Sequence, residues 1–279
     1  MNFAIIGVGG YIARKHLKAI KETGNNLIAA VDVNDSVGIL DSFFPECIFF
    51  TEMNKFLYHI NGEVDYISIC TPNYLHFKHC IDAMCAGANV ICEKPLVINP
   101  TELNILKRLA MDKKKSINVI LQLRLHPSVE DLKTEAGNNE VNLRYITPRG
   151  QWYDVSWKGN KCKSGGVLMN IGIHMFDLLL YLYGDMKEHA DTVICKKTAS
   201  GTLFLEKANV KWYLSTCYEK ETNRMLQVNG VPHWFDDNFN NLHTLSYEKI
   251  INGEGFTIND TKKSIALIKD LYKGSIQDI

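Results

Sequence analysis

The sequence lacks an excess of charge of either sign. Its 279 residues contain 31 lysines and arginines and 31 aspartates and glutamates, so the formal net charge is zero. A balanced charge provides no extended basic field for a nucleic acid or an anionic membrane. We therefore expect neither as a partner, and any anionic ligand must be held by a local group of side chains.

Paired cysteine motifs and long apolar segments are also missing. The eight cysteines contain no C-x-x-C pair, which indicates buried, reduced thiols and predicts neither a zinc site nor a disulfide framework. No apolar run reaches the length of a bilayer, and the residues after Met1 do not have the pattern of a signal peptide. We expect a cytoplasmic protein without a bound metal.

Short β-branched runs alternate with longer helical stretches along the first part of the chain. Strands are expected at residues 3–6, 27–31, 65–70, 89–92 and 117–123, helices at 13–23, 75–86 and 100–114, and a weaker unit at 48–58. This alternation is typical of βαβ units with a parallel sheet. The sequence therefore predicts the α/β class for a first domain at residues 1–121.

The pattern changes at about residue 122 to half-buried strands with hairpin connections. Strands are expected at 141–145, 192–196, 202–206, 209–216 and 225–228, with one helix at 174–182 among them. This predicts a second domain, residues 122–279, of α+β type with a mostly antiparallel open sheet. We expect one apolar sheet face with limited helix cover, and hence a homo-oligomer, a dimer or tetramer, formed through this sheet.

A glycine-rich turn joins the first expected strand to the first expected helix. It contains Gly7, Gly9, Gly10, Tyr11 and Ile12. Small residues allow a tight turn and close approach of a pyrophosphate, which the helix N-terminus also attracts. The strict G-x-G-x-x-G motif fails because Ile12 occupies the position of its third glycine. A loop one residue longer would place small residues where the motif needs them, with Gly10 and Ala13 as the last two.

Asp32 ends the second expected strand, 22 residues after Gly10. At this position a carboxylate can accept hydrogen bonds from the adenosine ribose hydroxyls and would repel a 2′-phosphate. Strand, loop, helix and acidic residue together predict a Rossmann domain that binds NAD in preference to NADP. The alternative is an ordinary aspartate at a strand end.

Three motifs carry a resemblance to a known family. Thr71-Pro72-Asn73-Tyr74-Leu75-His76 and Glu93-Lys94-Pro95 follow successive expected strands, and the segment Gly165 to Asp177 has the pattern G-G-x-L-x-N-x-G-x-H-x-x-D. The sequence here resembles the glucose–fructose oxidoreductase/inositol dehydrogenase (Gfo/Idh/MocA) family. The resemblance implies NAD-dependent oxidation of an alcohol, with cofactor contacts from Thr71, Pro72, Asn73, His76, Glu93 and Lys94.

Lys94 and His174 are the catalytic residues that this resemblance implies. An ammonium group near the reacting hydroxyl can stabilise a developing alkoxide or, once neutral, accept its proton. The family usually has aspartate where this chain has Asn170. Because an amide can orient a hydroxyl but cannot accept its proton, we expect Lys94 and His174 to share that work. The alternative for His174 is a core histidine.

Additional segments narrow the resemblance to bacterial UDP-N-acetylglucosaminuronate 3-dehydrogenases of surface-polysaccharide (lipopolysaccharide) synthesis. They are residues 121–127, 145–153, 156–159 and 237–247, the last of which includes the pair Leu242-His243. The implied substrate is a UDP-sugar whose 3-hydroxyl becomes a ketone. The implied substrate contacts are Gln122, Arg124, Tyr153, Lys158, Asn170 and His174.

Other substrates and one other class of function stay open. The substrate could be neutral UDP-N-acetylglucosamine, a free sugar or a polyol. A non-catalytic NAD sensor is the alternative from a different class. Trp152 and Trp157 are expected to belong to the core or scaffold.

Overall fold

The structure, a computed structural model, describes residues 1–133, 137–219, 224–235 and 241–277, and it forms two compact units. The first unit comprises Met1–Gln122 with Asn241–Thr261, and the second comprises Leu123–Asn240 with Lys262–Ile279. The division expected from the sequence assigned residues 241–261 to the second domain. In the structure this segment instead packs into the first unit.

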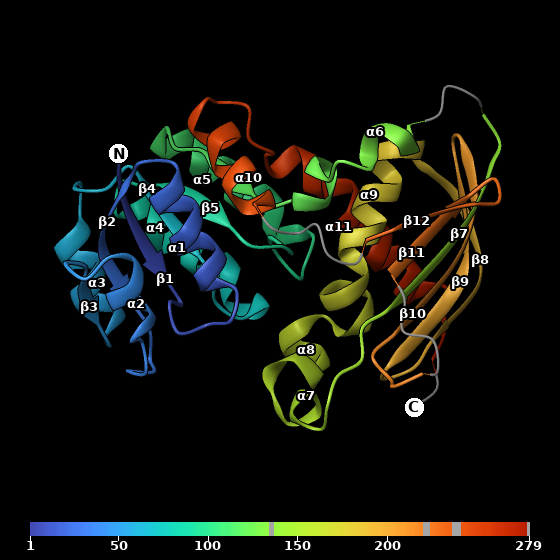
Figure 1. The fold of residues 1–279 in the computed structure, drawn as a ribbon, viewed down its shortest axis with the longest axis horizontal. Helices are drawn as coiled ribbons and strands as arrows, with labels where there is room; N and C mark the ends of the chain where they lie inside the picture. The colour runs from blue at the N-terminus through green and yellow to red at the C-terminus, as the bar shows by residue number, and fades with distance from the viewer. Residues whose placement is uncertain (134–136, 220–223, 236–240, 278–279) are drawn as a thin grey trace. The chain divides into compact units, whose positions relative to one another are not determined.

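The first unit contains a six-stranded parallel sheet in the order β3-β2-β1-β4-β5-β6 (Figure 1). The strands are β1 (Asn2–Ile6), β2 (Asn26–Val31), β3 (Ile48–Phe50), β4 (Tyr66–Ile69), β5 (Asn89–Cys92) and β6 (Ile117–Val119). The helices are α1 (Ala13–Glu22), α2 (Ile39–Phe43), α3 (Met53–Ile60), η1 (Asn73–Leu75), α4 (His76–Cys85), α5 (Thr101–Lys113) and α10 (Leu242–Ile251). This strand order is the Rossmann arrangement that the βαβ pattern predicted.

The central strand β1 lies between helices on both faces, which is why its residues Phe3 to Ile6 are buried on both sides. Helix α1 buries the apolar stripe of Leu17 and Ile20 against the sheet. Helix α10 packs on α1, and its Tyr247 ring stacks on Phe3 with ring centroids 5.8 Å apart. Residues from the far end of the chain therefore complete the core of the first unit.

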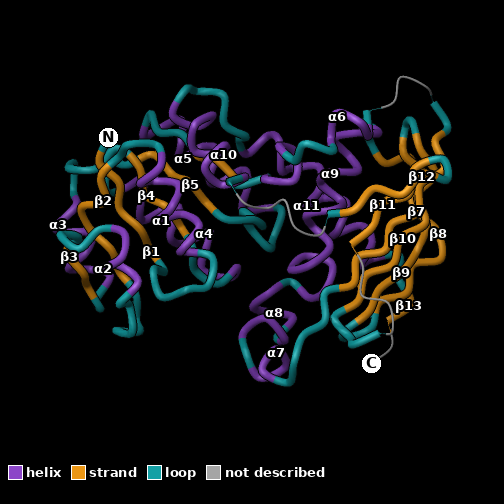
Figure 2. The backbone as a smooth tube through the Cα atoms, in the orientation of Figure 1, coloured by secondary structure: helices purple, strands orange, loops and turns teal. Residues whose placement is uncertain are grey.

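The second unit contains a seven-stranded sheet in the order β12-β11-β7-β10-β9-β8-β13, whose strands are orange in Figure 2. The strands are β7 (Asn139–Ile146), β8 (Met186–Ile194), β9 (Thr198–Leu205), β10 (Ala208–Ser215), β11 (Arg224–Val228), β12 (Val231–Trp234) and β13 (Ile276–Gln277). β7 pairs with β10 and β8 with β13 in parallel, and the other pairs are antiparallel. The sheet is thus mostly antiparallel, as expected, but not purely so.

More helices surround this sheet than the single one expected at 174–182. That helix is α9 (Ile173–Tyr183), and it is preceded by the π-helical turn η4 (Leu168–Gly172). The others are η2 (Gln122–Leu125), of which residues from Leu123 onward belong to this unit, α6 (Val129–Leu132), α7 (Trp152–Val155), η3 (Trp157–Gly159), α8 (Lys161–Ser164) and α11 (Ile258–Lys273), of which residues from Lys262 onward belong to this unit. Most are single turns, too short for a helical period to show in the sequence.

The two faces of this sheet differ from the expected pattern. On one face the Trp212 ring of β10 meets Phe176 of α9 edge-on, with ring centroids 5.2 Å apart, so the apolar face is covered by a helix. The opposite face is mixed, because Tyr213 lies there beside Arg144, whose guanidinium is 5.4 Å from the ring, together with the exposed Lys211. The sequence predicted an apolar face with limited helix cover, and at Trp212 helix α9 covers that face.

All eight cysteines are free thiols, but they are not all buried. Cys70, Cys80 and Cys92 are buried, whereas Cys85 and Cys162 are exposed. The sequence predicted buried thiols because several cysteines lie inside apolar runs, but exposure depends on which helix face a residue occupies.

One helical stretch in the described part of the chain, Lys161–Tyr183, is long and apolar enough to match a membrane span by composition. Most of its apolar window (78%) is buried inside the protein, as the core helix of a folded domain is.

Candidate functional site

The glycine loop between β1 and α1 has the geometry of a diphosphate cradle. Gly7 has a positive φ of 90°, and a Cβ there would lie 2.8 Å from Thr71 Cγ2. Both facts require glycine at this position. Helix α1 has no side-chain cap and no acidic residue in its first turn, so its positive end suits a negatively charged ligand. Exposed Tyr11 and half-buried Ile12 complete the loop.

Asp32 follows β2 directly and reaches the same loop. Its Oδ2 accepts a hydrogen bond from the Gly9 backbone N–H at 2.9 Å, and its Oδ1 accepts one from the Asn34 N–H at 2.9 Å. A carboxylate has about four lone-pair sites, so acceptor capacity remains for ribose hydroxyls. The loop and this carboxylate fit a dinucleotide whose ribose carries free hydroxyls.

The Thr71 to His76 segment links the glycine loop to the strand end that carries Lys94. His76 is buried, and its Nδ1 lies 2.7 Å from the Pro95 carbonyl oxygen while its Nε2 lies 2.8 Å from the Thr71 carbonyl oxygen. Burial lowers the pKa of His76, and the two carbonyl acceptors oppose that effect. Both ring nitrogens are therefore engaged by the protein backbone. The predicted cofactor residue His76 instead bridges two motifs.

The remaining members of this segment are also tied into the protein. Thr71 Oγ1 lies 2.9 Å from His79 Nδ1. Pro72 precedes η1, and the side chain of Asn73 at the start of η1 is buried. The segment thus forms a fixed wall at the carboxyl edge of the sheet, next to Gly7.

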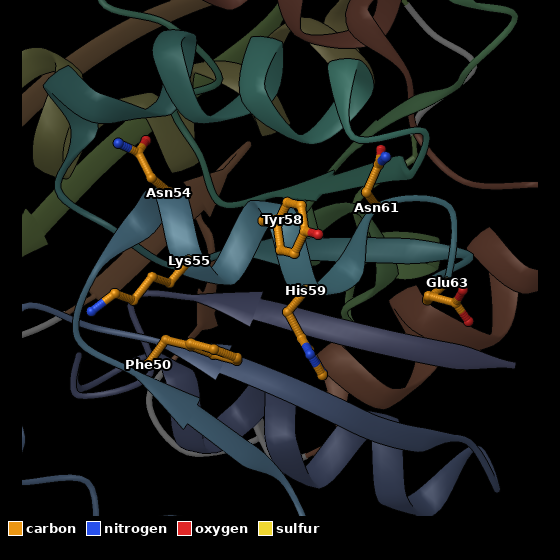
Figure 3. A pocket seen from close by; sticks show the side chains of 7 residues that line it. All are labelled: Phe50, Asn54, Lys55, Tyr58, His59, Asn61 and Glu63. Carbon is orange, nitrogen blue, oxygen red and sulfur yellow. The ribbon is translucent and has the colours of Figure 1, made fainter.

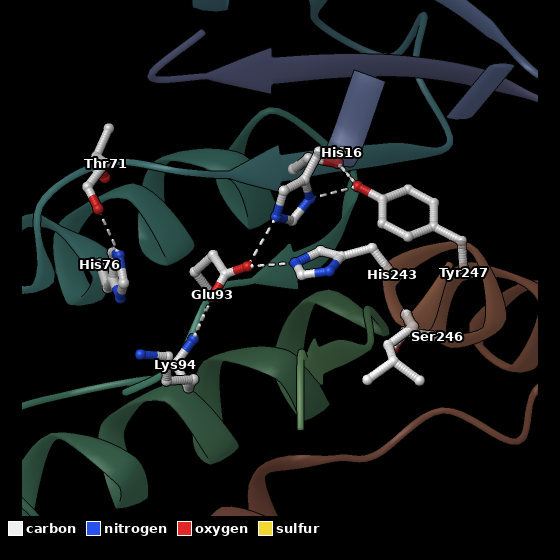
Figure 4. Close-up of polar contacts among 10 residues, drawn as sticks. His16, Thr71, His76, Glu93, Lys94, His243, Ser246 and Tyr247 are labelled. Atoms are coloured by element: carbon white, nitrogen blue, oxygen red, sulfur yellow. Dashed lines mark hydrogen bonds and ion pairs between the residues drawn. The ribbon is translucent and has the colours of Figure 1, made fainter. Parts of the chain in front are cut away.

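The Glu93 carboxylate, another predicted cofactor contact, points into the protein (Figure 4). Its Oε1 accepts hydrogen bonds from His16 Nε2 at 3.0 Å and from His243 Nε2 at 2.9 Å. Burial alone would raise the pKa of Glu93, but the hydrogen bonds from the two histidines outweigh it and hold the pKa well below its ordinary value. Glu93 is therefore an ionised, buried anchor.

Lys94 follows this anchor and is half-buried. Its backbone N–H donates to Glu93 Oε2 at 3.3 Å. The carboxyl ends of β1, β4 and β5 thus bring Gly7, Thr71 and Lys94 to one edge of the first sheet. Ligands of open α/β sheets bind at this edge.

The candidate residues of the second unit gather where η4 passes into α9. Asn170 lies in the π-helical turn, and its Nδ2 donates to the Tyr153 hydroxyl at 2.8 Å. His174 is half-buried in the first turn of α9. Burial raises the pKa of Tyr153, which keeps the phenol protonated. π-helical turns occur frequently at functional sites, and here one sets the spacing between Asn170 and His174.

Arg124 has a structural partner in the same unit. Its Nε and Nη2 donate to the two carboxylate oxygens of Asp177 at 2.8 and 2.9 Å, and the guanidinium lies 4.9 Å from the Tyr181 ring. Both charged side chains are at least 93% buried. The structure therefore assigns Arg124 to an internal ion pair, one turn beyond His174, and not to an open contact surface.

Lys158 borders a cavity of about 310 Å³ in the second unit. Its ammonium lies 5.4 Å from the Trp152 ring and 5.7 Å from the Trp157 ring. Burial, followed by the charge of Arg149, lowers the pKa of Lys158. Trp152 is 52% exposed, so of the two expected places, core or scaffold, the core is excluded. Tyr153, Lys161, Lys196 and Tyr272 also line the cavity.

Gln122 ends the first unit with a buried side chain whose Oε1 has no hydrogen-bond partner within the described residues. A buried acceptor without a donor is costly, so this oxygen suits a ligand donor. A separate surface pocket lies along α3 in the first unit, lined by Phe50, Asn54, Lys55, Tyr58, His59, Asn61 and Glu63 (Figure 3). None of the predicted site residues lines it.

Sequence reasoning missed the partners of Glu93. His16 lies inside the amphipathic pattern of α1, and His243 entered only through the resemblance of Leu242-His243, without a role. The separation of 150 residues between His243 and Glu93 leaves no local signal of their contact.

The fold and this site define a dinucleotide-binding oxidoreductase. Residues 1–121 match the family model described as "Oxidoreductase family, NAD-binding Rossmann fold", and residues 139–216 match "Oxidoreductase family, C-terminal alpha/beta domain". The chain belongs to the Gfo/Idh/MocA oxidoreductase family, and its cofactor is NAD.

A WlbA (WbpB) dehydrogenase from Thermus thermophilus resembles the chain throughout. Its structure with NAD and alpha-ketoglutarate matches with a TM-score of 0.94 and 40% identity, covering 100% of this chain and 97% of that one. Its structure with NAD and UDP-GlcNAcA matches with a TM-score of 0.94, 39% identity and the same coverage. The identity is high enough for a comparison of sites as well as of folds.

Curated relatives match shorter parts of the chain. The D-glucoside 3-dehydrogenase of Escherichia coli strain K12 is 28% identical over 43% of this chain and 36% of its own length. The glucose-6-phosphate 3-dehydrogenase of Bacillus subtilis strain 168 is 27% identical over 65% of this chain and 53% of its own length. The chain thus spans about a third to a half of these two relatives.

Proposed function

We propose that the protein oxidises the 3-hydroxyl of a UDP-N-acetylglucosamine-type sugar to a ketone, with the uronate as its preferred substrate. The observation that carries the proposal is the similarity of the whole chain to a dehydrogenase whose structure holds NAD and UDP-GlcNAcA. The names of both curated relatives also specify position 3 of a sugar. A role in lipopolysaccharide synthesis is part of this proposal.

The residues of the first unit supply the cofactor site and one proton acceptor. Bound NAD supplies the acceptor for the hydride that leaves the sugar carbon. The Gly7 loop and the α1 N-terminus hold the diphosphate, and Asp32 accepts from the ribose. Lys94 stabilises the developing alkoxide or, as the neutral amine, accepts the hydroxyl proton.

The residues of the second unit orient the sugar. The Asn170 amide, itself fixed by Tyr153, orients the reacting hydroxyl, and His174 shares the proton with Lys94. The Lys158 ammonium provides positive charge for an anionic group of the substrate, and Gln122 offers its unpaired oxygen to a donor. The ion pair with Asp177 takes two of the Arg124 N–H donors, so a substrate contact of Arg124 would use the others.

The first test is product formation by the purified protein. Incubation with stoichiometric UDP-N-acetylglucosaminuronate and NAD should yield a sugar two mass units lighter, detected by mass spectrometry even when NADH stays bound. A stronger signal with UDP-N-acetylglucosamine would assign the neutral sugar instead. Tight NAD binding without oxidation of any UDP-sugar would support the non-catalytic sensor.

The second test addresses the proton-handling residues. Lys94→Met and His174→Asn should each lower turnover by about 10²-fold or more while NAD affinity changes little. The double variant should be scarcely slower than the worse single variant, because residues that act on one proton form a unit. Unchanged turnover of His174→Asn would assign His174 to the core.

We also propose a cytoplasmic location, where NAD and nucleotide sugars are available, and assembly into a dimer or tetramer through the second sheet. The mixed face of Tyr213 and Arg144 provides both aromatic and charged groups for such a contact. Light scattering at micromolar concentration tests the assembly, and a strictly monomeric species would contradict it.

A further inference from the structure

A buried polar network adjoins Lys94 and extends to helix α10 (Figure 4). His16 from α1 and His243 from α10 both lie against Glu93 Oε1, at 3.0 and 2.9 Å. The side chains of all three residues are at most 7% exposed. Buried polar groups of this kind stabilise one arrangement strongly when their hydrogen bonds are satisfied.

The hydrogen-bond directions in this network are self-consistent. Because the ionised Glu93 oxygen can only accept, both Nε2 atoms carry a proton. In the tautomer with its proton on Nε2, His16 accepts through Nδ1 from the Tyr247 hydroxyl at 2.7 Å, and the Tyr247 oxygen accepts from the Ser68 hydroxyl at 2.5 Å. A continuous chain of donors thus runs from β4 through α10 and α1 to the end of β5.

A second contact holds the residue on the other side of Lys94. His76 Nδ1 lies 2.7 Å from the Pro95 carbonyl oxygen, and His76 Nε2 lies 2.8 Å from the Thr71 carbonyl oxygen. The tautomer with its proton on Nδ1 donates to Pro95. The residue before Lys94 and the residue after it are therefore each attached to a buried histidine. Lys94 itself is only half-buried.

We propose that His16, His76 and His243 are positioning residues for Lys94, which they hold in place by fixing Glu93 on one side and Pro95 on the other. The proposal rests on the proposed catalytic role of Lys94. It goes further in assigning a role to α10, whose His243 contributes to the placement of the lysine. A displacement of about 1 Å at a reacting group can cost about 10²-fold in rate.

A metal ion is the competing interpretation of the Glu93 side. One ligand atom from each of His16, Glu93 and His243 lies within 4.8 Å of the other two, and two histidines with one glutamate form a known zinc ligand set. However, the distances of 2.9 and 3.0 Å are those of N–H donors to a shared oxygen, and the described residues complete that pattern with Tyr247 and Ser68. Among the described residues, Glu93 Oε1 and both His16 nitrogens thus have partners without an ion, and His243 Nδ1 is the ring nitrogen left without one.

The experiment compares two substitutions of His243 in the full-length protein. His243→Leu removes the donor to Glu93, whereas His243→Gln keeps an N–H at a similar reach. Ser246→Ala is the matched control, because Ser246 is buried one turn away on α10 and, among the described residues, its hydroxyl bonds within that helix, to the Leu242 carbonyl. His76→Leu releases Pro95 from the other side.

Three readouts are measured for each variant: turnover and KM with the UDP-sugar, NAD affinity by fluorescence titration, and hydrogen exchange at the Lys94 amide. His243→Leu should lower turnover about 10-fold to 10²-fold with NAD affinity unchanged within about threefold, and the Lys94 amide should exchange faster. His243→Gln should recover most of the loss, and Ser246→Ala should match the parent. His76→Leu should also slow turnover.

The outcomes separate this proposal from the proposed function. Unchanged turnover and exchange in His243→Leu would overturn it, and so would a His243→Gln variant as impaired as His243→Leu, because packing alone would then explain the effect. One equivalent of zinc per chain in the purified protein would also overturn it. If no UDP-sugar is oxidised, the proposed function fails, and exchange at the Lys94 amide still decides whether the histidines fix this segment.

Discussion

The ion pair between Arg124 and Asp177 allows a stability prediction that is independent of substrate. Asp177→Asn keeps the shape of the side chain but leaves a buried guanidinium without its counter-charge. The two bonds of 2.8 and 2.9 Å and side-chain exposures of 7% and 5% place this pair among buried salt bridges. Removing one partner of such a pair costs about 3–5 kcal/mol. The thermal midpoint should therefore fall by roughly 6–20 °C.

Calorimetry of the variant and of two controls tests this reasoning. Glu130→Gln breaks the exposed pair of Glu130 with Lys133 in the same unit, whose side chains are 78% and 47% exposed, and should cost at most about 1 kcal/mol. Arg124→Met combined with Asp177→Leu removes both charges and should recover most of the loss. An Asp177→Asn variant within about 1 kcal/mol of the parent would refute the assignment of Arg124 to an internal pair.

Three further perturbations test the first unit. Asp32→Ala should weaken NAD binding by roughly 10-fold or more, since a hydrogen bond to a charged group contributes about 1.5–3 kcal/mol, and it should weaken NADP binding less. Equal affinities of the unmodified protein for NAD and NADP would contradict the assigned role. Gly7→Ala should lower both NAD affinity and stability because of its φ of 90° and the 2.8 Å approach to Thr71, whereas Gly38→Ala, with no atom within 4 Å, should change neither. Burial lowers the pKa of His79 from 6.5 to about 4, so as the pH falls the unfolded chain binds a proton at this residue before the folded chain does. The free energy of unfolding should therefore be unaffected by His79 above pH 6.5 and should decrease by up to about 3 kcal/mol as the pH falls toward 4. A His79→Asn variant with the same pH dependence of unfolding would exclude this residue as the cause.

The parallel sheet and the positions of its motifs could be predicted because their signals are local. The strand at residues 3–6, the glycine turn and Asp32 follow one another within a single βαβ unit, where periodicity and spacing suffice. Thr71 and Lys94 each follow a parallel strand, and because parallel strands have their carboxyl ends at one edge of the sheet, the location of both residues at that edge could also be predicted. These predictions needed no knowledge of side-chain directions.

Side-chain partners were less predictable because they depend on tertiary contacts. An arginine beside a motif could equally bind an anionic substrate or an internal carboxylate, and only the contact with Asp177 distinguishes the two. His76 and Glu93 belong to the family motifs, but the sequence could not show that both point into the protein. The short helices around Trp152 were missed because a single turn has too few residues for an apolar period.

The return of residues 241–261 to the first unit has a consequence for synthesis of the chain. The strands and helices before Gln122 emerge from the ribosome first, but the helix that covers Phe3 and supplies His243 follows about 120 residues later. At 5–20 residues per second this interval lasts roughly 6–24 s. During that time the surface around Phe3, His16 and Glu93 has no α10 to bury it. A fragment cut after residue 122 would keep that surface permanently exposed. The first unit therefore requires residues 241–261 in order to fold stably.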